Sequence, residues 1–239
     1  MWNMSDLYIV FKNLKINISR DNDGYINKNF RPGCVGEDLK RSILLMMNKL
    51  KKEQIAPFLF LIANITTIPK HGSKILLKNE RGIFRVSVLR NIFMRLIYNQ
   101  EYPTIDQNMS DSNIGGRKNR GCRNHIFIVN GIIHDVMNTV KNNPVVIQIY
   151  DFSQMFDAIK LEEAICDMFD VGVQNDNLNL LYKSNKDIYM AVKTPYGLSE
   201  RKIITSSVLQ GDTWGPSFVS VQVDQICKDA EEMGHIYKY

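Results

Sequence analysis

The sequence of 239 residues predicts an α+β fold. Segments with apolar residues at helical spacing occur along the chain, and short β-branched runs lie between them. Two alternating segments flank Pro195-Tyr196-Gly197, a pattern typical of an antiparallel hairpin. Because helices and strands alternate and a hairpin is included, α+β is the expected class.

In the N-terminal half, residues 37–53 predict an amphipathic helix whose apolar positions are Leu39, Ile43, Met46, Met47 and Leu50. A strand is expected at Ile65–Ile68, and the Pro-Lys-His-Gly-Ser-Lys segment at 69–74 indicates a turn. Residues 86–98 again have a helical pattern. Between Tyr102 and Asn113 the chain is polar and aperiodic, which predicts a loop.

In the C-terminal half, Ile126–Val140 is an apolar helical run, and Pro144 then marks a break. The β-branched run Val145–Tyr150 predicts a short buried strand. A helix follows, with an apolar stripe and a terminating Gly172. The stripe consists of Leu161, Ile165, Met168 and Phe169.

Further helices are expected around Asn177–Lys183 and at Phe218–Glu232. Between them, Ile188–Thr194 and residues 201–209 are the two predicted strands of the hairpin.

Composition narrows the class of protein. A hydrophobic content of 44% supports one large domain or two small ones, and a net charge of +5 permits a polyanionic partner without requiring one. The four cysteines lie far apart without ligand spacing, so neither a zinc site nor a disulfide framework is indicated, and a reducing, intracellular compartment fits best. No signal peptide is recognised, and no apolar run approaches the ~20 residues of a membrane helix.

A basic loop precedes the apolar run. Residues 117–123 carry four cations, and three glycines lie at 115, 116 and 121. A flexible backbone with cationic side chains suits contact with phosphates, but charged loops are often simply solvated. Composition leaves both interpretations open.

Asp151 lies directly after the predicted strand Val145–Tyr150, and Asp157 follows six residues later. A sheet would hold the carboxylate rigidly at its edge, which is a suitable place for a metal ligand. The same pattern fits an ordinary helix cap, where the carboxylate accepts backbone N–H bonds. Asp157 is interpreted as structural.

The stretch Tyr150–Ile159 (YDFSQMFDAI) resembles the first palm motif of reverse transcriptases of non-LTR (LINE-type) retrotransposons. Three further segments resemble motifs of the same enzymes, in the family's order, so that the resemblance covers roughly residues 20–232. These segments are Ile68–Ile83 in the fingers, Met109–Gly121 in the next motif, and Ser207–Pro216 in the second palm motif. Within the last, Thr213-Trp214-Gly215 replaces the usual Pro-Leu-Ser.

The resemblance implies a right-hand polymerase fold with fingers and an incomplete palm, and without a thumb. Residues 1–143 would form the fingers region with an N-terminal extension, and residues 144–239 a partial palm. The implied reaction is RNA-directed DNA synthesis by two-metal nucleotidyl transfer, with Mg²⁺ or Mn²⁺ as cofactor. The implied partners are an RNA template, a DNA primer and deoxynucleoside triphosphates, and no membrane.

Site residues follow position by position from the resemblance. Asp151 matches the first catalytic, metal-binding aspartate, and Phe152 matches the neighbouring position whose backbone carbonyl also binds metal. Phe156 matches the bulky side chain that excludes a 2′ hydroxyl. Gln210 and Gly211 match the pair that lines the nucleotide pocket.

The cations are assigned in the same way. Lys70 and Arg81 match fingers residues that bind the triphosphate, where arginine makes a planar paired contact and lysine a point charge. Arg117, Lys118 and Arg120 are assigned to the template or primer backbone.

Family members follow the second palm motif with two adjacent aspartates, and no Asp-Asp pair occurs in this sequence. One carboxylate cannot offset the repulsion between two divalent ions held ~4 Å apart. The chain is therefore expected to be a reverse transcriptase fragment, truncated before that motif and inactive alone. The alternatives are a non-catalytic nucleic-acid-binding remnant, whose binding would be salt-dependent, and a non-functional relic.

Overall fold

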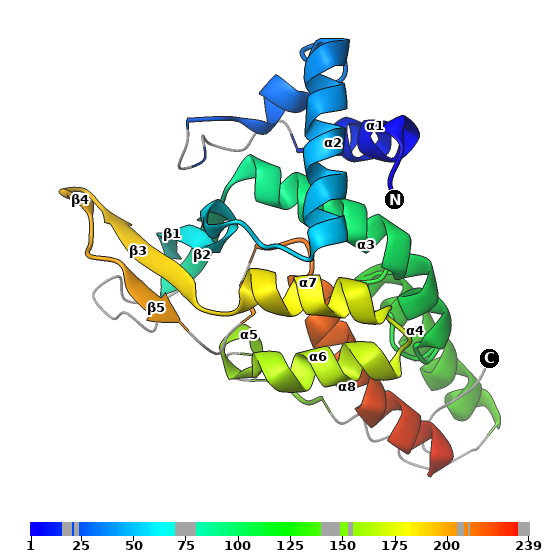
Figure 1. Cartoon of the computed structure of the whole chain (residues 1–239). Coiled ribbons are helices and arrows are strands. Elements are labelled where there is room, and N and C mark those ends of the chain that lie inside the picture. The colour runs from blue at the N-terminus through cyan, green and yellow to red at the C-terminus, as the bar shows by residue number, and fades with distance from the viewer. Residues whose placement is uncertain are drawn as a thin grey trace.

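The computed structural model describes residues 1–15, 21, 24–69, 80–139, 149–152, 155–204, 208–209 and 211–233 (Figure 1). The α-helices are α1 (Met4–Lys12), α2 (Glu37–Glu53), α3 (Val88–Asn108), α4 (Cys122–Thr139), α5 (Met155–Ala158), α6 (Leu161–Asp170), α7 (Asn175–Asn185) and α8 (Gly215–Glu232). The strands are β1 (Ile62–Pro69), β2 (Glu80–Val86), β3 (Ile188–Thr194), β4 (Gly197–Leu198) and β5 (Lys202–Ile204). Two 3-10 turns, η1 (Asn27–Phe30) and η2 (Phe58–Leu61), complete the elements of these residues.

The sheet joins the two halves of the chain. β1 pairs antiparallel with β2 and parallel with β3, and β3 pairs antiparallel with both β4 and β5. The predicted hairpin is confirmed, since Thr194 faces Gly197 across its turn. The parallel pair brings β1 beside a strand from beyond residue 144, so the predicted fingers and palm regions share one sheet.

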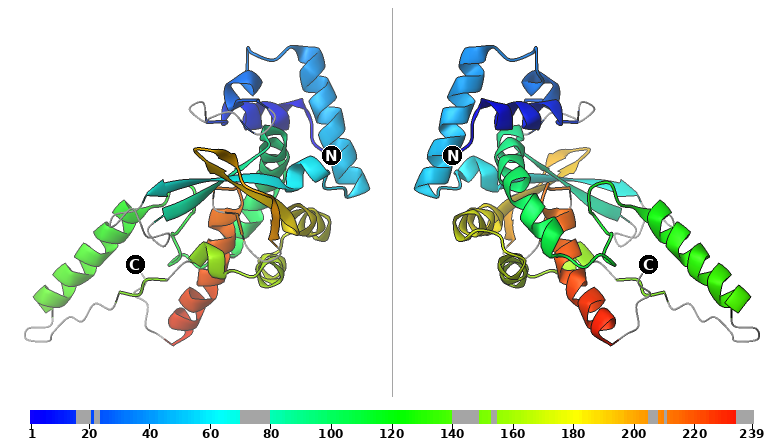
Figure 2. Two further views of the ribbon diagram at one scale, coloured as in Figure 1. Left: turned by 90° about the vertical axis from the view of Figure 1, so that its left-hand side faces the viewer. Right: turned by 90° about the vertical axis from the view of Figure 1, so that its right-hand side faces the viewer.

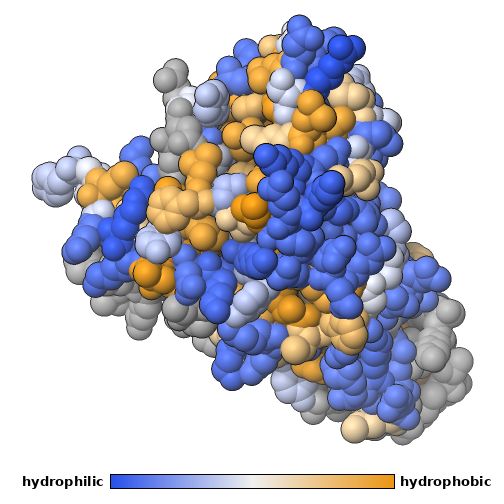
Figure 3. Space-filling model, viewed as in Figure 1, coloured by the Kyte–Doolittle hydropathy of each residue, from blue (hydrophilic) through white to orange (hydrophobic). Residues whose placement is uncertain are grey.

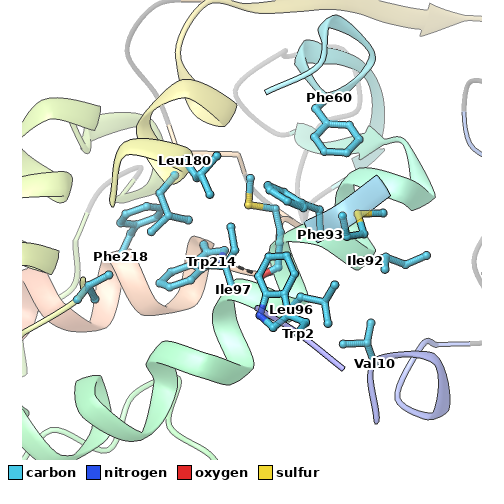
Figure 4. Close-up of a cluster of buried hydrophobic side chains, with 14 of the residues drawn as sticks. Trp2, Val10, Phe60, Ile92, Phe93, Leu96, Ile97, Leu180, Trp214 and Phe218 are labelled. Carbon is cyan, nitrogen blue, oxygen red and sulfur yellow. Dashed lines mark hydrogen bonds between the residues drawn. The ribbon is translucent and has the colours of Figure 1, made fainter. Parts of the chain in front are cut away.

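Helix α3 is the centre of the main core (Figures 1 and 4). Phe93 and Ile97 on α3 are fully buried, and Trp214, at the start of α8, packs beside them with an exposed fraction of 0%. The indole N–H of Trp214 donates to the carbonyl oxygen of Met94 at 3.1 Å. Trp214 thus joins the start of α8 to α3 by packing and by one hydrogen bond.

The predicted loop between Tyr102 and Asn113 is wrong in its first half. α3 continues to Asn108 although Pro103 lies inside it. Proline removes one helical hydrogen bond, but Tyr102 and Ile105 are buried in the core on either side of it. The burial of these side chains outweighs the local preference. Because α3 is buried on most sides, its pattern loses the periodicity of a half-exposed helix.

The predicted bounds of α2 are confirmed at Glu37–Glu53, but its apolar stripe is narrower than expected. Ile43 and Met47 are buried, whereas Leu39 and Met46 are exposed. α2 packs mainly against α1 and lies at the outside of the fold, so only one narrow face is covered (Figure 1).

Helix α6 buries Leu161, Ala164 and Met168 against α7 and α8. Phe169 was predicted on this stripe, but its side chain is 58% exposed. Around the helix axis, at about 100° per residue, Phe169 lies about 80° from Leu161, and Ala164 lies on the opposite side of Leu161. Phe169 is therefore at the edge of the buried face. The terminator is confirmed: Gly172 has a φ of +90°, and its N–H donates to the carbonyl of Phe169 at 2.9 Å.

Helix α4 is confirmed as a helix, but it is not part of the core. It projects from the body of the fold, away from α8 (Figure 2), and Phe127 is 82% exposed. The predicted strand Val145–Tyr150 lies largely outside the described residues. Its last two residues, Ile149 and Tyr150, are exposed and in no strand, so that part of the prediction is wrong: none of the described strands pairs with them.

The surface is mostly polar on the side of α7 and the C-terminal half of α2 (Figure 3). Among the described residues, no helix is both long and apolar enough to span a membrane.

Candidate nucleotide pocket and basic loop

Asp151 and Phe152, the predicted metal ligands, lie on an exposed segment. No strand leads directly into them, and residues 140–148 are outside the described part of the chain. Within the ranges that the structure describes, no group of three or more His, Cys, Asp or Glu side chains could hold a metal ion. The role of Asp151 as a metal ligand therefore stays a prediction.

A cavity of about 410 Å³ lies where the end of α1, η1, α3, α5 and the start of α8 meet. Phe156 from α5 and Gly211 from the turn before α8 both line it. These two residues are 55 positions apart in the sequence, and the resemblance assigns both to one nucleotide pocket. The volume lies in the range of small-molecule sites.

Gly211 has a backbone conformation that few other residues adopt. Its φ is +103°, and a Cβ at this position would lie 3.5 Å from the carbonyl oxygen of Phe84 on β2. The distance is an ordinary contact, so the strain on a side chain here would come from the left-handed backbone conformation. Glycine therefore lets the turn before α8 pass close to β2 while it lines the cavity.

Phe156 lies against the N-terminal turn of α8. A Cβ on Gly215 would be 3.3 Å from Cε1 of the Phe156 ring, so the absence of a side chain at Gly215 makes room for that ring. The ring is partly buried and packs against the main core. Phe156 is thus held as a wall of the cavity by the element that carries Gly215.

A buried ion pair fixes the turn that follows Gly211. Arg90 Nη2 donates to Asp212 Oδ2 at 2.8 Å, and the two side chains are 0% and 2% exposed. The same nitrogen donates to Asn185 Oδ1 at 2.9 Å, which ties the turn to α7 as well. The second oxygen of Asp212 accepts the N–H of Thr213. Asp212 therefore acts as a structural anchor.

Arg95 also lines this cavity, and it was absent from the predicted site. Burial lowers the pKa of its guanidinium, and its Nε is buried without a hydrogen-bond acceptor among the described residues. A signal was present in the sequence: Arg90 and Arg95 interrupt a segment, 86–98, that is otherwise mostly apolar. A buried cation requires a partner or a function.

Two predicted pocket residues, Lys70 and Gln210, lie outside the described residues. Arg81 lies on β2 opposite Ile68 and is exposed, and it is not among the described residues that line the cavity. Of the five predicted nucleotide-binding residues, the structure thus places Phe156 and Gly211 together.

Arg117, predicted to bind the nucleic-acid backbone, is buried inside the protein with an exposed fraction of 5%. Its Nε donates to Asp106 Oδ1 at 2.7 Å, and Nη2 donates to the Asp106 carbonyl at the same distance. Its Nη1 donates to the carbonyls of Ser110 and Asn113 at 2.7 and 3.0 Å. These four bonds give Arg117 the geometry of an internal clamp between α3 and the basic loop.

The two neighbouring cations are also engaged. Lys118 Nζ lies 4.2 Å from the ring centre of Tyr102 and 5.2 Å from that of Tyr98, and burial lowers its pKa. Arg120 pairs with the carboxylate of Asp111 at 3.1 Å and is partly exposed. Of the three predicted contacts with the nucleic-acid backbone, Lys118 is exposed and Arg120 partly exposed, whereas Arg117 is buried.

The basic loop is also tied to α8. The carboxylate of Asp224, 1% exposed, accepts the N–H of Ser110 at 2.9 Å and the amide of Asn113 at 3.0 Å. Gly116 has a φ of +68° and lies close to Pro216 in the first turn of α8. The loop therefore has a fixed shape that connects α3 to α8.

No protein-family model matches the chain, and no curated protein matches it.

Proposed function

We propose that this chain is a segment of a non-LTR reverse transcriptase that contributes the fingers and part of the palm, and that its cavity receives a deoxynucleoside triphosphate. The observation that carries the proposal is the cavity beside α3. Phe156 and Gly211, assigned to one pocket from separate motifs, line the same space. An RNA template and a DNA primer are the partners that belong to this function.

The second part of the proposal is that the chain alone does not polymerise. Two-metal nucleotidyl transfer requires several carboxylates around a pair of divalent ions. The sequence has no adjacent Asp-Asp pair, Asp151 is exposed, and no group of three or more His, Cys, Asp or Glu side chains that could hold a metal ion occurs in the described part of the chain. Nucleotide binding and catalysis are therefore separable properties of this chain.

A nucleic-acid-binding role that rests on the basic loop alone has less support. Arg117 is buried and its guanidinium is bonded within the protein, and Lys118 packs on two tyrosine rings. Lys118 and Arg120 are the cations of this set that keep surface within reach of a phosphate.

The test compares dATP with ATP, because these two nucleotides differ only by the 2′ hydroxyl. The purified protein is expected to bind dATP more tightly than ATP, and Phe156→Val is expected to reduce that preference because it removes the bulky wall. Phe127→Val is the matched control, since Phe127 is 82% exposed on α4. Equal affinity for the two nucleotides in the natural protein and in Phe156→Val would contradict the pocket assignment.

Primer extension on an RNA template tests the second part. With Mg²⁺ or Mn²⁺ the protein is expected to give no product. A product that Asp151→Ala abolishes would show that the chain is a complete catalyst and would overturn the second part of the proposal.

A further inference from the structure

The cavity beside α3 has an excess of positive charge among its described lining residues. Arg95 lies on its α3 wall and Lys15 at the end of α1. Thr213 and Pro216 bring the N-terminal end of α8 to the same wall, and no side chain caps that end. The N-terminus of a helix carries a partial positive charge and unpaired N–H groups.

The one acidic side chain among those lining residues does not balance this charge. Asp212 is bonded to Arg90 and to the N–H of Thr213. The Asp212 carboxylate raises the pKa of Arg95, but the larger effect on Arg95 is burial, which lowers it. No hydrogen bond or ion pair joins the two side chains. Arg95 therefore lacks a counter-ion bonded to it in the described part of the protein.

The position of Arg95 differs from that of Arg90. Both are partly unsatisfied, since Arg90 Nε and Nη1 and Arg95 Nε have no acceptor among the described residues. Arg90 is 0% exposed and has Asp212 as its partner. Arg95 lines a space that a ligand can enter. A partly buried guanidinium that lines a cavity without a bonded anion is a suitable site for one.

We propose that Arg95 binds the phosphate chain of the nucleotide that enters this cavity. That the ligand is a nucleotide rests on the proposed function. That the ligand is an anion follows from the charge of Arg95. A guanidinium makes planar, paired hydrogen bonds to phosphate oxygens, and these bonds strengthen where water is excluded. A compact phosphate chain matches the way Arg95, Lys15 and the N-terminal end of α8 line one space of about 410 Å³. Phe156 and Pro216 then form the apolar part that faces the nucleoside.

The experiment measures the affinities of the full chain for inorganic tripolyphosphate, dATP and deoxyadenosine at constant ionic strength. Arg95→Met is expected to weaken tripolyphosphate and dATP by about ten-fold or more, from the loss of charged hydrogen bonds. The affinity for deoxyadenosine should stay within about two-fold, because its contacts are apolar. Arg95→Lys keeps the charge but not the planar pair of donors, so its affinities for tripolyphosphate and dATP are expected to lie between those of the natural protein and of Arg95→Met. Arg41→Met, on the exposed face of α2, is the control and should leave all three affinities unchanged.

The outcomes separate this inference from the proposed function. If dATP binds and Arg95→Met binds it with natural affinity, Arg95 is not the phosphate ligand, and the pocket assignment stands. If tripolyphosphate binding depends on Arg95 but dATP binds no tighter than tripolyphosphate, the result supports an anion site at Arg95 and contradicts the nucleotide pocket. If the natural protein binds neither, both fail. If Arg95→Met does not melt cooperatively, Arg95→Lys is the deciding variant. An affinity of Arg95→Lys for tripolyphosphate equal to that of the natural protein would contradict a planar contact between Arg95 and phosphate.

Discussion

The internal position of Arg117 leads to a prediction that separates a structural role from nucleic-acid binding. Arg117→Met removes the guanidinium but keeps most of the apolar length of the side chain. Four hydrogen bonds are lost, to the carboxylate Oδ1 and the backbone carbonyl of Asp106 and to the carbonyls of Ser110 and Asn113. The Arg117 side chain is 2% exposed, so water cannot replace these bonds easily.

The expected loss of stability follows from these contacts. Breaking a buried pair costs about 3–5 kcal/mol, but the Asp106 side chain is 35% exposed and recovers part of its solvation. We therefore expect the free energy of unfolding to fall by about 3 kcal/mol. In a chain of 239 residues this corresponds to a decrease in Tm of roughly 6–12 °C.

Arg120→Met is the matched control in the same loop. Its partner Asp111 is 94% exposed, so its loss should change the free energy of unfolding by less than about 0.5 kcal/mol. Urea unfolding of the two variants measures the difference. The salt dependence of single-stranded RNA binding provides a second readout, and Arg117→Met should not change its slope. Equal stabilities for the two variants, with a shallower slope in Arg117→Met, would refute the internal role and return Arg117 to the nucleic-acid surface.

Three further predictions concern the same framework. The Arg117 guanidinium lowers the pKa of Asp106, so this pair stabilises the fold above pH ~3.8 and less as the pH falls below it. The gap between the urea midpoints of the natural protein and Arg117→Met should narrow below that pH without closing, because three of the Arg117 bonds go to backbone carbonyls. A constant gap down to pH 3 would contradict this. Gly116→Ala should destabilise by about 1–2 kcal/mol because φ is +68° and the new Cβ would lie 3.2 Å from the Pro216 carbonyl oxygen. Gly121→Ala, with open space around its Cβ, is the control, and equal melting of the two variants would argue against strain. Trp214→Phe should lower the free energy of unfolding, measured by calorimetry, by about 2–4 kcal/mol, because it leaves a cavity and removes the hydrogen bond to Met94. A change below about 1 kcal/mol would show that the core repacks.

The sequence by itself determined the local structure where one face of an element is covered. The pattern at 37–53 predicted α2, and Gly172 predicted the end of α6, because periodicity and left-handed backbone preference act within a few residues. The hairpin at Pro195–Gly197 was readable for the same reason. The order of motifs also brought Phe156 and Gly211 into one predicted pocket.

The tertiary structure alone decided what depends on distant neighbours. The parallel pairing of β1 with β3 joins residues more than a hundred positions apart, and no local pattern encodes that partner. Pro103 stays helical because core side chains beside it are buried. The glycines and cations of the basic loop were compatible with a solvated loop and with a phosphate-binding one. The hydrogen bonds that bury Arg117 depend on where the folded chain places Asp106 and the loop carbonyls. The proposed role of Arg95 could not be predicted from the sequence either, because it depends on burial and on a neighbouring cavity, and both arise only in the folded chain.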